Sequence, residues 1–235
     1  MSSNRVMTHP QSFVKKLMKI ILWGLLALIA IFLAWQWITL VSGSNQWELI
    51  QDDNGIKVYS LKTPGSNLKK FKSITRVKAP LGSFVKMIHD PNSCGSFCHD
   101  GMLIEQVAPN LQYSSYKTNM PLMFQRREKV VMIHSEQDPE TKAVFVNIIA
   151  APNKTPRDPC CYRTTHKHNT WKITPVGDGE IEIEFVFDED FGGFIPAFMV
   201  NSVMDRYMYR VMYYMQDLLD RDEYKGARVD FIEEV

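Results

Sequence analysis

Apolar and polar residues are distributed differently in the first 46 residues and in the rest of the chain. Residues 20–41 carry no charged side chain and are mostly apolar. At about 1.5 Å of rise per residue, a helix of this length crosses the roughly 30 Å hydrocarbon core of a bilayer. From residue 47 onward, apolar residues recur at every second position or at helical spacing, which is typical of a folded domain. The pattern predicts a transmembrane helix at 20–41, a tether at 42–46 and one domain at 47–235.

The apolar segment is predicted to remain in the membrane as an uncleaved anchor. It is longer than the ~7–15 apolar residues of a usual signal-peptide core. Trp35 and Trp37 lie near its end, where amphipathic rings favour the membrane interface. A cleaved signal peptide, with Val41 and Gly43 as a weak cleavage pattern, is the main alternative, and a buried core helix is the third.

The charges around the anchor predict its orientation. Residues 1–46 contain no Asp or Glu, and their basic residues are Arg5, Lys15, Lys16 and Lys19. Positively charged flanks tend to stay in the cytoplasm. We therefore expect residues 1–19 to be cytoplasmic and the domain to lie on the other side of the membrane, in the periplasm if the protein is bacterial. The formal net charge is only +1, and the clustered excess of Lys and Arg needed by a nucleic-acid surface is missing.

Alternation of apolar and polar residues predicts an antiparallel sheet. Strands are expected at 54–62, 68–79, 102–108, 111–118, 125–137, 143–151, 163–176 and 180–190. Short connections such as Gly177-Asp178-Gly179 are typical of hairpins and favour a curved meander. In the last strand the apolar side chains share one face and the glutamates share the other, so one face is expected to be buried and the other solvated.

Helical spacing predicts a short helix at 80–90 and a long one near the end of the chain. The long helix is opened by Gly192-Gly193 and Pro196 and continues to Leu219, with a broad stripe of methionines, tyrosines and aliphatic residues. A helix that follows all the strands predicts an α+β architecture, in which it covers the concave face of the sheet.

The domain resembles the START family of lipid-transfer domains, related to the steroidogenic acute regulatory protein. The motifs are "WELIQDDNGIKVYS", "FKSITRVKAPLGSFVKMIHD", "NMPLMFQRREKVVM", "TWKITPVGDGEIEIEFVF" and, most specifically, "FGGFIPAFMVN". The resemblance implies a helix-grip fold, in which a U-shaped sheet holds the long C-terminal helix with a lipid-sized cavity between them. It also implies that the first motif begins with the end of a helix. The implied activity is binding, with possible transfer, of a hydrophobic ligand, without a cofactor.

Candidate ligand-facing residues follow from the periodicity of the strands and the last helix. They are Tyr113, Ile183, Phe185, Phe187, Met199, Val203, Tyr207 and Val211. Methionine adapts to different apolar shapes, and tyrosine adds a polar end to an apolar body. The candidate gate comprises Gly192, Gly193 and Pro196 with the loops at 94–101 and 152–162. The same helix would be ordinary core in an alternative interpretation, a membrane-anchored interaction or sensory module.

The four cysteines are expected to form disulfides outside the cytoplasm, although the sequence leaves their connectivity open. Two bonds from the Cys94/Cys98 pair to the Cys160/Cys161 pair are geometrically simpler than a bond between neighbours. Neither pair has the tight Cys-x2-Cys spacing of structural zinc sites, so we expect no metal there, even with His99 nearby.

Sequence patterns of catalysis do not favour an enzyme. The chain has no Gly-x-Ser-x-Gly, no His-Glu-x-x-His and no phosphate-binding glycine loop. His166 and His168 share one face of a strand and are expected to be solvated. Arg126-Arg127-Glu128 is expected to form a surface pair at the start of a strand, and the alternative is that it places one charge inside the cavity opening. A helix-grip enzyme acting on an apolar substrate is the remaining alternative.

Overall fold

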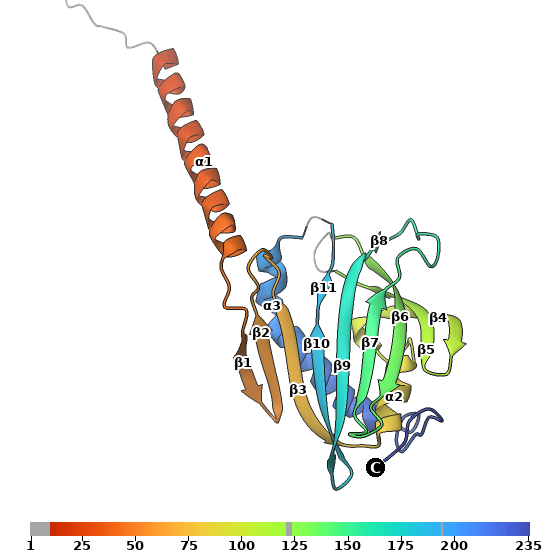
Figure 1. The fold of residues 1–235 in the computed structure, drawn as a ribbon. Coiled ribbons are helices and arrows are strands. Elements are labelled where there is room, and N and C mark those ends of the chain that lie inside the picture. Colours follow the sequence, from red (N-terminus) through yellow and green to blue (C-terminus); the bar gives the residue numbers. More distant parts are fainter. Residues whose placement is uncertain (1–9, 121–123, 194) are drawn as a thin grey trace, which may run out of the picture.

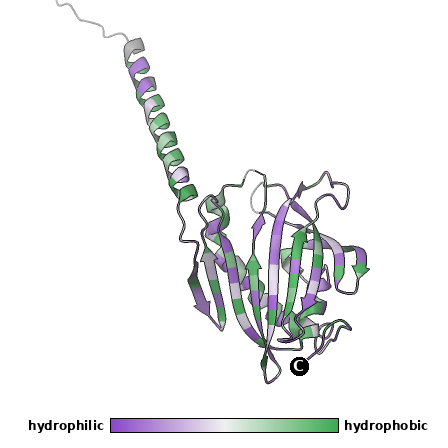
Figure 2. Ribbon diagram, in the orientation of Figure 1, coloured by the Kyte–Doolittle hydropathy of each residue, from purple (hydrophilic) through white to green (hydrophobic). Residues whose placement is uncertain are grey.

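A computed structural model describes residues 10–120, 124–193 and 195–235 of the chain. Helix α1, Pro10–Val41, projects away from a domain built of one sheet and two further α-helices (Figure 1). The segment Phe13–Val41 is long and apolar enough to cross a membrane, and none of it is buried in the protein. Figure 2 shows that hydrophobic residues dominate α1, whereas they alternate with polar residues along the strands of the domain.

Within the described residues, the sheet has eleven strands. The longer ones are β1 (Trp47–Asp53), β2 (Ile56–Leu61), β3 (Lys70–Lys78), β4 (His99–Ala108), β5 (Leu111–Thr118), β6 (Arg127–Gln137), β7 (Val144–Ala150), β9 (His166–Gly177) and β10 (Glu180–Phe187). They lie in the order β1-β2-β3-β10-β9-β7-β6-β5-β4, and each neighbouring pair is antiparallel. The short strands β8 (Tyr162–Arg163) and β11 (Glu189–Asp190) pair with β6 and β9.

The expected simple meander is wrong at one point. Strand β3 pairs with β10 and not with β4. After β3 the chain passes through helix α2, Leu81–His89, and the 3₁₀ turn Gly95–Phe97 to the opposite edge of the sheet, where β4 lies. The last hairpin, β9–β10, then fills the space between the two halves. Hairpin signals identify neighbours in the sequence, but they carry no information on this crossing.

The segment expected to be the end of a helix is strand β1. It forms a hairpin with β2, in which Trp47 lies opposite Leu61 and Asp53 opposite Ile56. The turn residues Asn54 and Gly55 have φ values of 48° and 74°. Two consecutive positive φ values define the type I′ turn that Asn-Gly favours between two strands.

Helix α3, Ala197–Leu219, packs in the concave face of the sheet, as the amphipathic pattern predicts. Its fully buried residues are Met204, Met208, Met212, Met215, Leu218 and Leu219. They belong to the same hydrophobic core as the inward residues of β10, which are buried at every second position while the glutamates between them are more exposed. Together with α2, these residues form one hydrophobic core, and the predicted helix-grip α+β fold is confirmed.

The end of α1 lies against the domain beside the first turn of α3. The Thr39 hydroxyl is 3.1 Å from Asn67 Oδ1, and the Gly65 amide donates to the Leu40 carbonyl at 2.8 Å. The rings of Trp35 in α1 and Phe198 in α3 are 6.4 Å apart. The start of α3 is thereby held next to the end of the apolar helix.

Candidate ligand cavity

Two adjoining cavities, an inner and an outer lobe, lie between the concave face of the sheet and α3. The inner lobe has a volume of about 130 Å³ and the outer lobe about 790 Å³. Both lobes are lined by Phe97, Cys98, Thr118, Lys129 and Tyr207. Volumes of about 300–1,000 Å³ are usual for small-molecule sites, so the outer lobe is large enough for a substantial ligand.

The outer lobe is mainly apolar on the side of α3. The apolar residues there are Ile195, just before α3, and Met199, Val200, Val203 and Met204, while Ser202, Tyr207 and Arg210 of the same helix add polar groups. Val203 remains 56% exposed, and it belongs to the same first turns of α3 that lie beside α1. The first turns of α3, with the exposed Val203, therefore lie at the end of the domain from which α1 emerges (Figure 1).

The structure places most of the sequence candidates at or behind this cavity. Phe185, Met199, Val203, Tyr207 and Val211 line one or both lobes. Ile183 and Phe187 are buried in the hydrophobic core behind the lining residues. Phe187 packs edge-on against Tyr207, with 5.9 Å between the ring centroids.

The assignment of Tyr113 is wrong by one strand position. Its ring lies on the other face of β5, where the Lys154 ammonium is 4.1 Å from the ring centroid. The inward residues are Gln112, Ser114 and Tyr116, two of which line the inner lobe. Polar side chains therefore face the cavity on this strand, which reverses the usual apolar-in pattern and explains the error.

A buried cluster of charged residues forms the polar wall of the cavity. Lys129 Nζ lies 2.5 Å from Glu189 Oε1, and Lys167 Nζ lies 2.6 Å from Glu189 Oε2. The side chains of the two lysines are each 4% exposed and that of Glu189 is 0% exposed. Burial raises the pKa of Glu189, but the two ammonium groups lower it by more, so the pKa is below its usual value. Lys129 lines both lobes and Lys167 lines the inner one.

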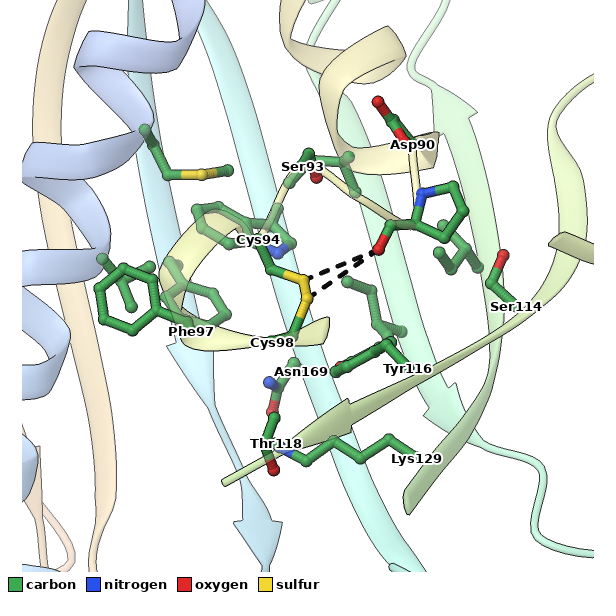
Figure 3. Close-up of a pocket in the computed structure, with 18 of the residues that line it drawn as sticks. Asp90, Ser93, Cys94, Phe97, Cys98, Ser114, Tyr116, Thr118, Lys129 and Asn169 are labelled. Carbon is green, nitrogen blue, oxygen red and sulfur yellow. Dashed lines mark hydrogen bonds between the residues drawn. A yellow bond between two sulfur atoms is a disulfide. The ribbon is translucent and has the colours of Figure 1, made fainter. Parts of the chain in front are cut away.

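Uncharged polar groups surround the Lys129–Glu189–Lys167 cluster. Burial raises the pKa of Tyr116 to about 12 and also raises the pKa of Tyr207, so both phenols are neutral hydrogen-bonding groups. The buried Thr118 Oγ1 and Trp171 Nε1 have no hydrogen-bond partner among the described residues. Figure 3 shows Thr118, Lys129 and Asn169 close together at one end of the inner lobe.

The loop that closes the inner lobe is held by the Cys94–Cys98 disulfide. Between the two cysteines, Phe97 extends towards α3 (Figure 3), where its ring is 5.5 Å from the ring of Tyr207 and 5.7 Å from that of Tyr214. Disulfide formation is confirmed, but the expected cross-pairing is wrong. The second bond joins the neighbours Cys160 and Cys161, whose Cα atoms are 3.7 Å apart.

The expectation of a surface ion pair at Arg127-Glu128 is also wrong. Both residues are buried and point in different directions. The Arg127 guanidinium donates to the carbonyls of Phe191 and Gly192, at 2.6 and 2.9 Å. Glu128 instead accepts a 2.9 Å hydrogen bond from the buried Arg163. Arg127 thus holds the segment that leads into α3.

The candidate gate residues lie in this segment. Gly192 and Gly193 have φ values of 62° and 68°, a region that L-residues with side chains rarely adopt. Pro196 precedes the first turn of α3 with an extended backbone. In the described part of the chain, no three His, Cys, Asp or Glu side chains come together in a way that could hold a metal ion.

Solved structures with the same fold are STAR-related lipid transfer domains. The protein from Xanthomonas axonopodis aligns with a TM-score of 0.69 and 22% identity, covering 74% of this chain and 99% of that one. Human STARD10 aligns with a TM-score of 0.68 and 16% identity over 79% of this chain and 78% of its own. Human StarD13 aligns with a TM-score of 0.65 and 13% identity over 91% of this chain and 98% of its own.

Sequence comparison adds one relative and no family assignment. No family model matches the sequence. An uncharacterised protein of Pseudomonas aeruginosa is 26% identical over 163 residues, which are 68% of this chain and 79% of that protein. The domain therefore has the START fold, joined to an N-terminal helix that is long and apolar enough to span a membrane.

Proposed function

We propose that the chain is a membrane-anchored lipid-binding protein that holds one hydrophobic ligand in the cavity between the sheet and α3. The observation that carries the proposal is the outer lobe of about 790 Å³, which has many apolar side chains in its lining and adjoins an inner lobe with the buried Lys129 and Lys167 in its wall. Names of proteins with this fold describe lipid transfer. The action is physical: the ligand is bound and exchanged without chemical change.

The apolar wall supplies the driving force for binding. Burial of a methylene group contributes about 0.8 kcal/mol, so an acyl chain of ordinary length provides ample affinity. The lobe walls around Met199 and Val203 suit different chain shapes, because methionine has three rotatable bonds and a polarizable sulfur.

The membrane that holds α1 is the proposed source of the ligand. Residues 20–41 form the retained anchor, 42–46 the tether and 47–235 the binding domain. The N-terminal residues 1–19 lie in the cytoplasm, and the domain lies on the other side, in the periplasm if the protein is bacterial. Two disulfides agree with an oxidising compartment.

Exchange requires an opening, and the segment before α3 provides it. Gly192 and Gly193 act as the hinge, and Pro196 marks the start of the moving helical turns. The loops that carry the two disulfides form the other sides of the entrance. Release of the Arg127 hydrogen bonds to Phe191 and Gly192 would free this segment.

Photo-crosslinking tests the proposal. The full-length chain is reconstituted into vesicles that contain a diazirine-bearing phospholipid and a diazirine-bearing fatty acid, and crosslinked peptides are mapped by mass spectrometry. We expect crosslinks on peptides that line the two lobes, in addition to those on α1. Val211→Trp occupies much of the small inner lobe and should reduce cavity crosslinks several-fold, whereas Met199→Trp only narrows the larger outer lobe and should reduce them less.

The matched control is Tyr213→Trp, on the outer face of the same helix, where Tyr213 is 60% exposed. This variant should crosslink like the parent protein. Crosslinks confined to α1 in the parent protein would contradict the proposal and favour a module whose cavity has no lipid.

A further inference from the structure

The Lys129–Glu189–Lys167 cluster has one positive charge more than it has negative charge. Its two ammonium groups share a single carboxylate, and all three side chains are at least nine-tenths buried. Taking an ammonium out of water is unfavourable unless an opposite charge and hydrogen-bond acceptors replace the water. The cluster therefore has the electrostatic character of a site that is completed by an anion.

Neighbouring carboxylates do not supply the missing charge. Asp188, next to Glu189, pairs with Lys70 at 2.5 Å on the solvent side. Asp90 lines the inner lobe, but it accepts hydrogen bonds from the Tyr224 hydroxyl at 2.6 Å and the Asn92 amide at 2.8 Å. It also lies at the end of the lobe away from Lys129 (Figure 3).

Hydrogen-bond donors at the cluster remain available for a ligand. An ammonium has three N–H donors, and each lysine has one close protein oxygen, from Glu189, within the described part of the chain. The Lys129–Glu189 contact is short, yet Glu189 Oε1 has no hydrogen bond of acceptable direction. Thr118 Oγ1, which lies close to Lys129 (Figure 3), adds a further unpartnered donor, and Trp171 Nε1 is another unpartnered donor of a residue that lines the inner lobe. Such a set of groups matches the oxygens of a carboxylate or a phosphate.

The position of the cluster fixes how a ligand would lie. Lys129 lines both lobes, whereas most of the outer-lobe side chains from the first turns of α3 are apolar, and Ser202, Tyr207 and Arg210 are the polar ones. We propose that the cavity selects an amphiphile with a single anionic head group, a carboxylate or a phosphate, which binds against Lys129 and Lys167 on the side that lines the inner lobe. The apolar part of the amphiphile occupies the outer lobe. This inference rests on the proposed lipid-binding function and adds the chemical class of the head group.

A competition experiment with matched head groups tests the inference. The full-length chain in zwitterionic nanodiscs is crosslinked with the diazirine fatty acid while unlabelled competitors are added. Palmitic acid and hexadecyl phosphate are the anionic competitors, and hexadecanol and hexadecylamine are the neutral and cationic ones. Sodium acetate and inorganic phosphate test the anion without a chain. We expect the anionic amphiphiles to compete at least about tenfold better than hexadecanol, since a charge-assisted hydrogen bond contributes about 1.5–3 kcal/mol and 1.4 kcal/mol is tenfold.

Two lysine variants test whether the cluster causes the preference for anionic over neutral amphiphiles. Lys129→Met and Lys167→Met each leave one lysine paired with Glu189, so the remaining pair is neutral and retains its fold-stabilising contact. Each should reduce the anion-to-alcohol ratio about tenfold. Lys154→Met, on the opposite face of the sheet near Tyr113, is the matched control and should leave the ratio unchanged. Differences in how strongly the competitors partition into the bilayer affect every protein equally. They therefore cancel when the anion-to-alcohol ratio of a variant is compared with that of the parent protein in the same nanodiscs.

The outcomes separate this inference from the proposed function. Equal competition by palmitic acid and hexadecanol, with cavity crosslinks present, would overturn the anionic head group and leave lipid binding intact. Absence of cavity crosslinks with every amphiphile would overturn the proposed function itself. Competition by inorganic phosphate as strong as that by hexadecyl phosphate would show a site for a free anion and overturn the lipid assignment.

Discussion

Neutralising Glu189 should strongly destabilise the domain. Glu189→Gln keeps the shape of the side chain but removes the carboxylate that lies between two buried ammonium groups, at 2.5 and 2.6 Å. With an effective dielectric constant of about 20, a unit charge pair at this separation attracts by ~6 kcal/mol before desolvation is subtracted. Removing one partner of a buried ion pair usually costs about 3–5 kcal/mol, because the other charge is left uncompensated.

The assay is thermal unfolding of the full-length chain in a mild detergent, followed by near-ultraviolet circular dichroism. A loss of 3–5 kcal/mol corresponds to a fall in Tm of about 6–20 °C for a domain of this size. Glu182→Gln is the matched control on the neighbouring strand, where the carboxylate pairs with the exposed Arg76 at 2.8 Å. Exposed pairs contribute about 0–1 kcal/mol, so the control should change Tm by at most a few degrees.

The pH dependence gives an independent check of the same reasoning. The folded-state pKa of Glu189 is below its unfolded value of about 4.3. Its contribution to the free energy of unfolding is therefore complete above that pH and is lost as the pH falls through the folded-state pKa. The Tm difference between parent and Glu189→Gln should narrow in acid. Equal melting of Glu189→Gln and Glu182→Gln at neutral pH would refute the electrostatic account of the cluster.

Three further changes test other parts of the structure. Gly95→Ala should lower the free energy of unfolding by about 1–3 kcal/mol in urea titrations, because its Cβ would clash with a tyrosine of α3, whereas Gly55→Ala has equally positive φ but open space and should be milder. Joint replacement of Cys94 and Cys98 by serine should speed ligand release several-fold, because the loop that closes the inner lobe loses its disulfide. The release rate is measured by chasing a bound photoreactive lipid with unlabelled lipid, and an unchanged rate would contradict this role of the loop. Val203→Asp should slow lipid uptake from vesicles while changing stability by less than about 0.5 kcal/mol, because this rim residue is 56% exposed, and normal uptake would argue against entry there.

The fold could be predicted because its signals are local and redundant. Alternation along 180–187 identified both faces of β10, and helical spacing identified the buried face of α3. The partner of β3 could not be predicted in this way, since it lies about a hundred residues away in the sequence and depends on the crossing through α2.

The polar part of the cavity was missed, although a signal for it was present. Lys167 alternates with Asn169 and Trp171, and Lys129 alternates with Val131, so both lysines share a face with buried residues. Charged side chains on strands are usually solvated. This general rule predicts that both lysines face the solvent, whereas the alternation places them on the buried face. Glu189 continues the same alternation, two residues after the buried Phe187, and was missed for the same reason.

Native mass spectrometry of the full-length chain, released from detergent micelles after purification, tests the central claim most directly. The account predicts a discrete added mass, one ligand per protein, that is extracted by organic solvent and is sharply reduced in Val211→Trp but retained in Tyr213→Trp. A bare protein mass in all three proteins, unchanged after incubation with lipid vesicles, would contradict the account.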